Sequence, residues 1–414
     1  MYFVYNIFLF IVFLFSPIIF LVRMFNGKED PIRFKEKLCI YSKKNNLNSI
    51  WFHAVSVGEL MSILPILNIL EKNKQIDQII VTSSTISSAK IFEKQKFKKI
   101  VHRYFPIDTN FLNKKFINYW KPKAAFFVDS EIWPNMFKNL KKSNIPVILL
   151  NARITKKSFK RWFLIKNFSN LVFKNISLAL PSNTETKNFL KKLGANKIKF
   201  IGNLKYYGLS KINNNKKKIL KNKFKNFKVW CAASTHEGEE ILISNVHKNL
   251  KKNQKNLLTI IIPRHIDRVE KIIELMNKNQ LEVIRHSSNK NINKNTDIYL
   301  VDTYGEASNF YDLSNVCFMG GSIINHGGQN PLEPARLGNY ILNGPNIGNF
   351  KEIYEFLSKN NMSITTSNLD KIQKIIEKKL NKKISNLNKT KIIKIGEKIL
   401  NGNMIYINKF IRWI

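Results

Sequence analysis

The chain has 414 residues, too many for one hydrophobic core of ordinary size, so two domains are expected. Its three cysteines, Cys39, Cys231 and Cys317, are scattered without metal-binding spacing, which argues against a disulfide framework and favours buried apolar roles in a reducing compartment. The 69 Lys and Arg outnumber 28 Asp and Glu, which gives a net charge of +41. Such a charge attracts nucleic acid, acidic lipid or phosphorylated substrates. A compositional bias toward Lys, Asn and Ile explains the excess of lysine equally well.

The first predicted element is an N-terminal membrane helix. Residues 2–22 carry no charge, and at helical rise they span about 30 Å, one hydrocarbon core, with a tolerated kink at Pro17. The basic residues that follow predict that the rest of the chain lies on the cytoplasmic side of the membrane: Arg23, Lys28, Arg33, Lys35 and Lys37. A signal peptide is disfavoured because no basic residue precedes the apolar run, while an anchor lying in one leaflet remains the alternative.

Ten apolar strands alternate with helical patterns along the rest of the chain. Such strands indicate parallel sheets covered on both faces, and two sets of them predict an α/β protein with two doubly wound domains. The predicted strands are 50–55, 78–81, 124–128, 146–150 and 176–180 in the first half, then 228–233, 257–262, 297–301, 316–319 and 340–342.

The domain boundary is expected in a lysine-rich stretch, 211–228, which holds eight lysines and no acid. The predicted organisation is an anchor helix at 1–24, a Rossmann-like domain at 25–205, a linker at 206–226, a second Rossmann-like domain at 227–398 and a C-terminal helix at 399–414. The aromatic and apolar end, 405–414, is expected either to pack on the first domain or to touch the membrane.

Polar clusters follow eight of the predicted strands. They are 56–59, 82–85, 129–135, 151–153, 234–240, 263–265, 302–306 and 320–322. Because ligands of open parallel sheets bind beyond the carboxyl ends of the strands, the clusters predict a cleft between two facing sheets.

Glu59 has two possible roles at the start of a predicted helix. It is a candidate general base, with Gly58 beside it, and the helix dipole is expected to keep it ionised and to lower its pKa. The spacing Ser56-x-x-Glu59 also fits a capping box, in which the glutamate only satisfies backbone amides. The same box is predicted for Ser234 and Glu237.

Three further residues of the first half are candidates. Asp129 and Glu131 lie two apart after a strand and so point the same way toward one ligand, unless they are the N-cap and first-turn acid of the next helix. Lys205 is placed to neutralise a phosphate or a sugar carboxylate, although an ordinary surface lysine is the simpler interpretation.

In the second half, Arg264 follows a strand directly and is suited to bidentate phosphate contact. Gly320 and Gly321 close another strand, and the glycine-rich segment 327–334 leads into a helix whose amides would attract phosphate, with Glu333 placed to accept hydrogen bonds from ribose hydroxyls. No P-loop or dinucleotide fingerprint is present, and the histidines lack the spacing of a metal site.

The segment 51–60 reads Trp-Phe-His-Ala-Val-Ser-Val-Gly-Glu-Leu and resembles the 3-deoxy-D-manno-octulosonic acid (Kdo) transferases. The resemblance extends, in order, over nearly the full length of the chain. The matching segments are 53–59, 131–135, 151–153, 202–205, 234–240, 263–265, 302–306, 320–322, 330–333 and 344–345.

This resemblance implies a GT-B fold, CMP-Kdo as donor, a lipid A precursor as acceptor, inversion of configuration, and no cofactor or metal. It implies that Glu59 is the catalytic base and that Asp129 and Lys205 stabilise the transition state. The implied CMP contacts are Pro263, Arg264, Tyr304, Gly305, Glu306, Asn330, Pro331, Leu332 and Glu333. Two positions depart from the family pattern, Asp129 in place of a glutamate and Tyr304 in place of a methionine.

Two other classes of function compete with this interpretation. One is a membrane-associated glycosyltransferase that uses a different sugar nucleotide. The other is a basic protein that binds nucleic acid or anionic lipid, but the aromatic residues form no RNA-binding pattern, so no nucleic-acid partner is expected. The number of Kdo units transferred, the acylation of the acceptor and the oligomeric state stay open.

Overall fold

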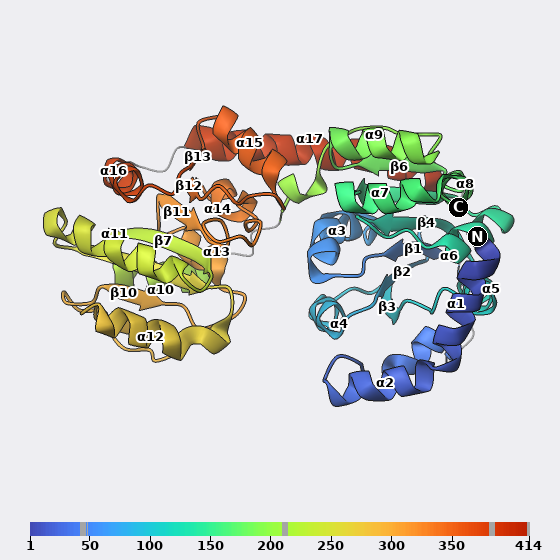
Figure 1. The fold of residues 1–414 in the computed structure, drawn as a ribbon, viewed down its shortest axis with the longest axis horizontal. Coiled ribbons are helices and arrows are strands. Elements are labelled where there is room, and N and C mark those ends of the chain that lie inside the picture. The colour runs from blue at the N-terminus through green and yellow to red at the C-terminus, as the bar shows by residue number, and fades with distance from the viewer. Residues whose placement is uncertain (42–46, 48, 209–213, 381–385, 412–414) are drawn as a thin grey trace. The chain divides into compact units, whose positions relative to one another are not determined.

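The computed structural model describes residues 1–41, 47, 49–208, 214–380 and 386–411. The chain divides into two compact units (Figure 1), Met1–Gly208 with Gly396–Ile414, and Leu209–Ile395. The stretch expected as a linker, 206–226, contains helix α10 (Asn214–Phe224), which belongs to the second unit, while residues 209–213 lie outside the described part of the chain.

Unit 1 is built on a six-stranded parallel sheet with the order β3-β2-β1-β4-β5-β6. Its strands are β1 (Ser49–His53), β2 (Gln78–Ser83), β3 (Ile100–Tyr104), β4 (Pro122–Val128), β5 (Val147–Ala152) and β6 (Leu178–Pro181). The helices that cover it are α3 (Val57–Leu70), α4 (Ile86–Glu93), α5 (Asn110–Trp120), α6 (Pro134–Lys142), α7 (Lys156–Leu164), α8 (Lys166–Phe173) and α9 (Thr184–Leu193). The central strands are buried on both faces, as Trp51, Phe126 and Phe127 illustrate, which explains their continuous apolar sequence.

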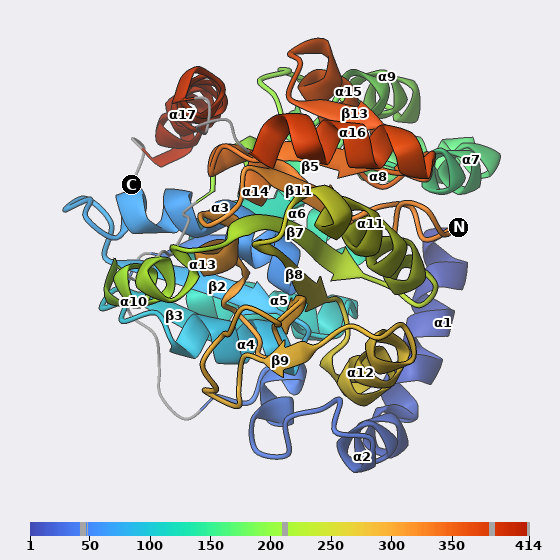
Figure 2. The ribbon, with the colours of Figure 1, turned by 90° about the vertical axis from the view of Figure 1, so that its left-hand side faces the viewer.

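Unit 2 is built on a seven-stranded parallel sheet with the order β13-β12-β11-β7-β8-β10-β9. Its strands are β7 (Lys228–Thr235), β8 (Leu257–Pro263), β9 (Val283–Arg285), β10 (Ile298–Leu300), β11 (Val316–Met319), β12 (Tyr340–Asn343) and β13 (Ser363–Thr365). Its further helices are α11 (Glu239–Asn253), α12 (Val269–Lys278), α13 (Ala307–Tyr311), α14 (Leu332–Arg336), α15 (Lys351–Lys359) and α16 (Leu369–Leu380). Trp230 of β7 shares one buried cluster with residues of α11, α12 and α16, so these three helices cover one face of the sheet (Figure 2).

The strand order reverses between central strands at β1/β4 in unit 1 and at β7/β11 in unit 2. At such a point the loops leave neighbouring strands in opposite directions, which opens a crevice at the carboxyl edge. These two points are therefore where each unit is expected to bind its ligand.

All ten predicted strands are confirmed, and three further strands, β3, β9 and β13, were not predicted. Each of the three lies at an edge of its sheet. β3 reads Ile-Val-His-Arg-Tyr, with half-exposed residues at alternate positions, and β9 and β13 are three residues long. Short or half-polar edge strands give a weak sequence signal for a strand. They are held in place by pairing with the neighbouring strand, and not by their own apolar residues.

The N-terminal segment is bent at Pro17, as predicted, and the bend divides it into two helices. The segment forms α1 (Tyr2–Leu14) and α2 (Ser16–Phe25), which are bent by 56° at the break. Pro17 explains the break because it lacks an N–H and its ring clashes with the carbonyl of Phe13 four residues earlier. No single helix of the described chain is long and apolar enough to cross a bilayer, although this bent pair passes by length and composition.

The C-terminal helix α17 (Asn386–Ile411) belongs to unit 1 from Gly396 onward. Its glycines allow close approach to the segment that precedes residue 208: a Cβ at Gly396 would lie 2.8 Å from the carbonyl oxygen of Tyr206, and one at Gly402 would lie 2.7 Å from Ile201. Of the two expectations for the chain end, packing on the first domain holds for Ile405–Ile411, and residues 412–414 lie outside the described part.

Candidate functional site

The polar clusters of unit 1 flank the point where the strand order reverses. Glu59 lies in the first turn of α3, directly after β1, and Asp129 and Glu131 follow β4. Both acidic residues are close enough to Glu59 to raise its pKa by repulsion. The structure therefore brings together three carboxylates that the sequence had placed in two separate clusters.

Glu59 is held at the start of α3 by the bonds of a capping box. Its backbone N–H donates to Ser56 Oγ at 3.3 Å, while its carboxylate accepts the Ser56 hydroxyl at 3.0 Å and the N–H of Val55 at 2.7 Å. The capping interpretation is thus correct as geometry, with Val55 in place of the usual N-cap amide. Gly58 is exposed, and a Cβ at this position would meet nothing within 4 Å, so the approach to this helix start is open.

The pKa of Glu59 is raised to about 7, against the sequence-based expectation of a lowered value. Burial is the largest cause, and repulsion by Glu131 and Asp129 adds to it, while the hydrogen bonds from Val55 and Ser56 oppose the shift. Desolvation and two neighbouring negative charges outweigh these two hydrogen bonds. A carboxylate that titrates near neutral pH is a better general base than one with an ordinary pKa.

Glu131 is hydrogen-bonded by Trp133 and lies beside His53. The Trp133 indole N–H donates to Glu131 Oε2 at 2.9 Å, and Nε2 of the fully buried His53 lies 3.5 Å from the same oxygen. His53 Nδ1 contacts Thr82 Oγ1 at 2.9 Å, and the imidazole stacks on Phe105 with ring centroids 3.9 Å apart. Burial lowers the pKa of His53, so this imidazole is neutral and does not cancel the charge of Glu131.

Asp129 and Lys205 form an ion pair across the carboxyl edge of the sheet. Lys205 Nζ lies 3.1 Å from Asp129 Oδ2, and the lysine side chain is only 20% exposed, so it is not an ordinary surface lysine. Asn151 fixes the lysine segment, because its Oδ1 accepts the N–H of Leu204 at 2.9 Å. The helix-cap alternative for Asp129 and Glu131 is wrong, since α6 begins at Pro134 with Trp133 as its N-cap.

The backbone is strained where the strands of unit 1 meet this site. Asp129 has φ 61° and Asn151 has φ 50°, both in the left-handed region that non-glycine residues rarely adopt. Such strain clusters at functional sites, where the surrounding structure holds it in place. At Asp129 it also means that the segment is not extended, so the reason given for Asp129 and Glu131 pointing the same way does not apply.

In unit 2, Glu239 organises the loops at the reversal point. This fully buried carboxylate accepts the backbone N–H groups of His236 at 3.0 Å, Gly321 at 2.7 Å, Ser322 at 3.0 Å and Ile323 at 3.0 Å. The ends of β7 and β11 approach closely, because a Cβ at Gly320 would lie 2.3 Å from the carbonyl oxygen of Ser234.

The predicted capping box of Ser234 and Glu237 is wrong. Ser234 lies within β7 with φ 55°, and α11 begins at Glu239 after a Gly238 N-cap that makes no side-chain capping bond. The close packing of β7 against β11 keeps Ser234 in the strand and delays the helix by several residues.

The expected donor residues lie around the carboxyl ends of β8 and β10. Pro263 is the buried last residue of β8, and Arg264 follows it with an exposed side chain. Tyr304 and Gly305 are exposed in the loop before α13. Glu306 pairs with Lys216 and accepts hydrogen bonds from Thr303 at 2.7 Å and His286 at 2.9 Å. Burial opposes ionisation, but these bonds outweigh it and lower the pKa of Glu306 to about 2, so it stays a hydrogen-bond acceptor at any physiological pH.

The segment before α14 has a mixed character. Pro331 and Leu332 are buried, so their side chains serve the core. Asn330 Oδ1 accepts the N–H of Leu332 at 3.1 Å, and Glu333 accepts a hydrogen bond from Ser308. Helix α14 has five residues, so its dipole is weaker than the sequence suggested. Among the residues that the structure describes, no group of three His, Cys, Asp or Glu side chains is arranged to hold a metal ion.

Comparison with known proteins identifies the family. Residues 32–207 match the family model described as 3-deoxy-D-manno-octulosonic-acid transferase (kdotransferase). A 3-deoxy-D-manno-octulosonic acid transferase of Rickettsia bellii is 32% identical over 378 residues, 90% of each chain. The chain belongs to the Kdo transferase family. A Haemophilus influenzae protein of the same name is 32% identical over 340 residues, 81% of this chain and 79% of that one.

The predicted fold class is also confirmed. A glycosyltransferase of Rickettsia africae is similar over 88% of this chain and 99% of that structure, with a TM-score of 0.57 and 14% identity. At that identity the likeness concerns the fold alone. Each unit has the Rossmann-like parallel sheet of the GT-B glycosyltransferases.

Two residues with a clear structural role, His53 and Glu239, were not singled out from the sequence. Both lie inside segments that match the family pattern, 53–59 and 234–240, so their position in the sequence already indicated a role. Their partners lie far along the chain, Glu131 for His53 and Gly321 for Glu239, and no local pattern predicts such pairs.

Proposed function

We propose that the protein transfers Kdo from CMP-Kdo to a lipid A precursor with inversion of configuration. The observation that carries the proposal is the cluster at the reversal point of unit 1, where the capped Glu59 lies at the start of α3 and Asp129 pairs with Lys205; burial and the neighbouring carboxylates raise the pKa of Glu59 to about 7. Membership of the Kdo transferase family supports the choice of transferred sugar. Both substrates are anionic, which suits a net charge of +41.

The acceptor chemistry is assigned to unit 1. A sugar hydroxyl of the lipid attacks the anomeric carbon of Kdo, and Glu59 takes the hydroxyl proton as the new C–O bond forms. The bond between that carbon and the phosphate oxygen breaks on the opposite face, and CMP leaves with the electron pair. Lys205, held by Asp129, balances the carboxylate of Kdo or the charge that develops during transfer.

Donor binding is assigned to unit 2. Arg264, exposed at the end of β8, is suited to pair with the phosphate of CMP. Glu306, ionised and fixed by three partners, is suited to accept hydrogen bonds from ribose or base. The remaining proposed contacts are Pro263, Tyr304, Gly305, Asn330, Pro331, Leu332 and Glu333, of which the buried Pro331 and Leu332 would act through their backbone.

The reaction is proposed to take place at the cytoplasmic face of the inner membrane, where a lipid acceptor is reached. The uncharged segment 2–22 and the basic residues after it support this location.

The test uses the full chain with CMP-Kdo and a tetra-acylated lipid A precursor, followed by mass measurement of the product. We expect a mass increase of one or more Kdo units, and a turnover reduced by roughly a hundredfold or more in Glu59→Gln. Glu185→Gln, which alters a half-exposed glutamate elsewhere in unit 1, serves as the matched control and should keep full activity. Full turnover in Glu59→Gln with the fold intact would remove the assigned base.

The same assay separates the rival enzyme class. Sugar nucleotides other than CMP-Kdo are offered in parallel, and turnover of a UDP-sugar without turnover of CMP-Kdo would contradict the proposed donor. Salt-sensitive DNA binding without any transfer would contradict enzymatic function altogether.

A further inference from the structure

Helix α1 has two faces of opposite character. Its inward face packs on unit 1: Leu9 is buried, the rings of Tyr2 and Phe168 lie 4.9 Å apart, and Phe13 packs against the core cluster. The outward face is exposed and apolar along its whole length. Its exposed residues are Phe3, Val4, Ile7, Phe8, Phe10, Ile11 and Leu14.

The inward face is tied to unit 1 by hydrogen bonds to Asp108 and to two asparagines near it. The Tyr5 hydroxyl donates to Asp108 Oδ2 at 2.8 Å, and Asn6 Oδ1 accepts hydrogen bonds from Asn110 at 3.1 Å and Asn135 at 2.7 Å. Asp108 is 1% exposed and also accepts the N–H of Met136 at 2.8 Å at the start of α6. Withdrawal of α1 from unit 1 would break these bonds, and inside a bilayer Tyr5 and Asn6 would have no partners to replace them.

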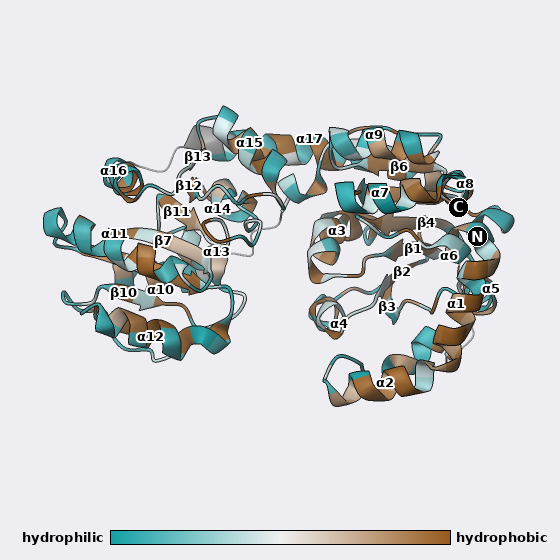
Figure 3. Ribbon diagram, viewed as in Figure 1, coloured by the Kyte–Doolittle hydropathy of each residue, from teal (hydrophilic) through white to brown (hydrophobic). Residues whose placement is uncertain are grey.

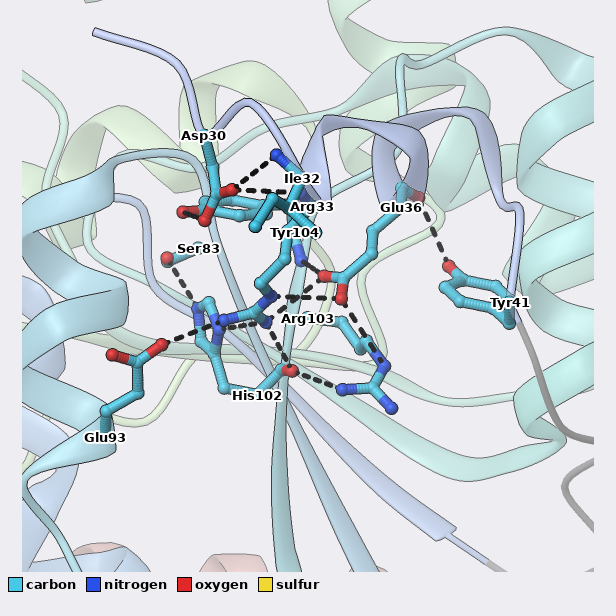
Figure 4. A network of polar contacts seen from close by, with 10 residues as sticks. All are labelled: Asp30, Ile32, Arg33, Glu36, Tyr41, Ser83, Glu93, His102, Arg103 and Tyr104. Atoms are coloured by element: carbon cyan, nitrogen blue, oxygen red, sulfur yellow. Dashed lines mark hydrogen bonds and ion pairs between the residues drawn. The ribbon is translucent and has the colours of Figure 1, made fainter. Parts of the chain in front are cut away.

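Helix α2 is likewise attached to unit 1. Glu29 is 3% exposed and pairs with Arg23 of α2 at 2.9 Å and with Lys37 at 2.6 Å. Lys37 belongs to η1 (Arg33–Leu38). In the same element, Arg33 bonds to Glu36 of η1, Glu93 of α4 and His102 of β3 (Figure 4). Part of the basic cluster that the sequence assigned to a membrane flank therefore forms a network that joins α2 to the sheet edge.

Helix α2 follows α1 after the bend, and both helices are largely hydrophobic in sequence (Figure 3). The exposed apolar residues of α2 are Ile18, Ile19, Leu21, Val22 and Phe25, and Ile32 follows beyond the helix. Lys28 and Lys35 are exposed near its end, and the first acidic residue of the chain, Glu29, is buried in its ion pairs. The surface is therefore apolar with a basic end, which complements an anionic lipid leaflet.

Neither helix alone matches the thickness of a bilayer. The 13 residues of α1 and the 10 of α2 extend about 20 Å and 15 Å, against about 30 Å of hydrocarbon. We propose that α1 and α2 lie in the plane of one leaflet of an anionic bilayer, with their outward apolar face at the acyl boundary and α1 still docked on unit 1. The inference concerns membrane geometry and does not depend on the proposed transferase reaction.

Depth measurements test the proposal. The full chain is labelled with an environment-sensitive fluorophore at Phe3→Cys, Phe10→Cys or Leu14→Cys and bound to vesicles of phosphatidylethanolamine and phosphatidylglycerol. We expect all three probes at a similar shallow depth of roughly 5–10 Å, quenched by labels near the headgroup more than by labels at the acyl end. Lys96→Cys, at an exposed lysine elsewhere in unit 1, is the control and should stay unquenched. A steep change of depth from Phe3 to Leu14 would overturn the proposal.

Topology and charge give two independent readouts. An N-terminal epitope should be cleaved by protease added on the side of the two units, whereas protection of the epitope would mean that the segment crosses the bilayer.

Replacing Lys28 and Lys35 by Gln should weaken binding to anionic vesicles by roughly tenfold, while the same change at Lys96 and Lys98 should not. Equal binding of the native chain to neutral vesicles would contradict the anionic preference. A protein that passes these tests but transfers no Kdo would refute only the proposed function.

Discussion

At the scale of single residues, the local environment of Glu59 decides its chemistry more than its helix position does. The same side chain closes a capping box and has a pKa raised to about 7, because burial and two neighbouring carboxylates outweigh the hydrogen bonds from Val55 and Ser56. Glu131 is the larger of the two charged causes, and neutral His53 leaves its charge in full effect.

Glu131 is therefore expected to set the pH dependence of the reaction. A general base must be ionised, so a raised pKa of Glu59 moves the acid limb of the rate profile to higher pH. Glu131→Gln removes one repelling charge, lowers the pKa of Glu59 and should shift this limb to lower pH by roughly 0.5–1 unit, as measured by kcat/KM against pH. Glu185→Gln should leave the limb in place. An unshifted limb in Glu131→Gln with retained activity would show that another group titrates.

The contacts of the candidate site mark the limit of sequence reasoning. The polar clusters were predicted at the right strand ends because a parallel sheet brings those ends to one edge. The pairing of Asp129 with Lys205 joins residues 76 apart, and it depends on how Asn151 holds the segment around Leu204. Such pairs result from tertiary packing, which no spacing rule encodes.

At the scale of elements, sequence reasoning worked where an element is self-sufficient and failed where a neighbour shapes it. The central strands were predicted from their own apolarity, whereas the edge strand β3 depends on β2 and on the network around Arg33. The start of α11 was misplaced for the same reason, since Ser234, packed against Gly320 of the next strand, lies within β7 and not at the start of a helix.

Glu239 should be essential for the loops of unit 2. In Glu239→Gln an NH2 group replaces one carboxylate oxygen. An NH2 group cannot accept a hydrogen bond, so the buried backbone N–H groups that face it lose their acceptor. We expect a loss of about 3 kcal/mol or more in the free energy of unfolding, measured by denaturant titration followed at a probe in unit 2. Glu237→Gln, at an exposed residue of the same motif, is the matched control and should change stability little. Equal stability of the two variants would mean that water replaces the carboxylate.

At the scale of the whole molecule, the net charge of +41 acts over distance while the apolar face of α1 and α2 acts only on contact. Salt screens the electrostatic attraction, because the Debye length falls to about 10 Å at 0.1 M, but it does not screen the apolar contact. Association and dissociation should therefore respond differently to ionic strength.

We expect the association rate with anionic vesicles to fall by at least about tenfold between roughly 30 and 300 mM salt, with a much smaller change in the dissociation rate. Stopped-flow mixing followed by dilution into unlabelled vesicles measures both rates. Neutral phosphatidylcholine vesicles are the control, for which association should be slow and independent of salt. A dissociation rate that rises as steeply as the association rate falls would mean that charge alone holds the protein on the membrane.

Helix α17 starts in unit 2 and ends in unit 1, so unit 1 is assembled from both ends of the polypeptide. On the ribosome, the strands of unit 1 emerge first, yet Gly396 and Gly402, which pack against the segment carrying Lys205, are translated nearly two hundred residues later. A nascent chain would thus reach the lipid through α1 while the segment around Lys205 still lacked its contacts with α17. Activity would therefore not appear before α17 has been translated, and products that end before α17 would remain inert.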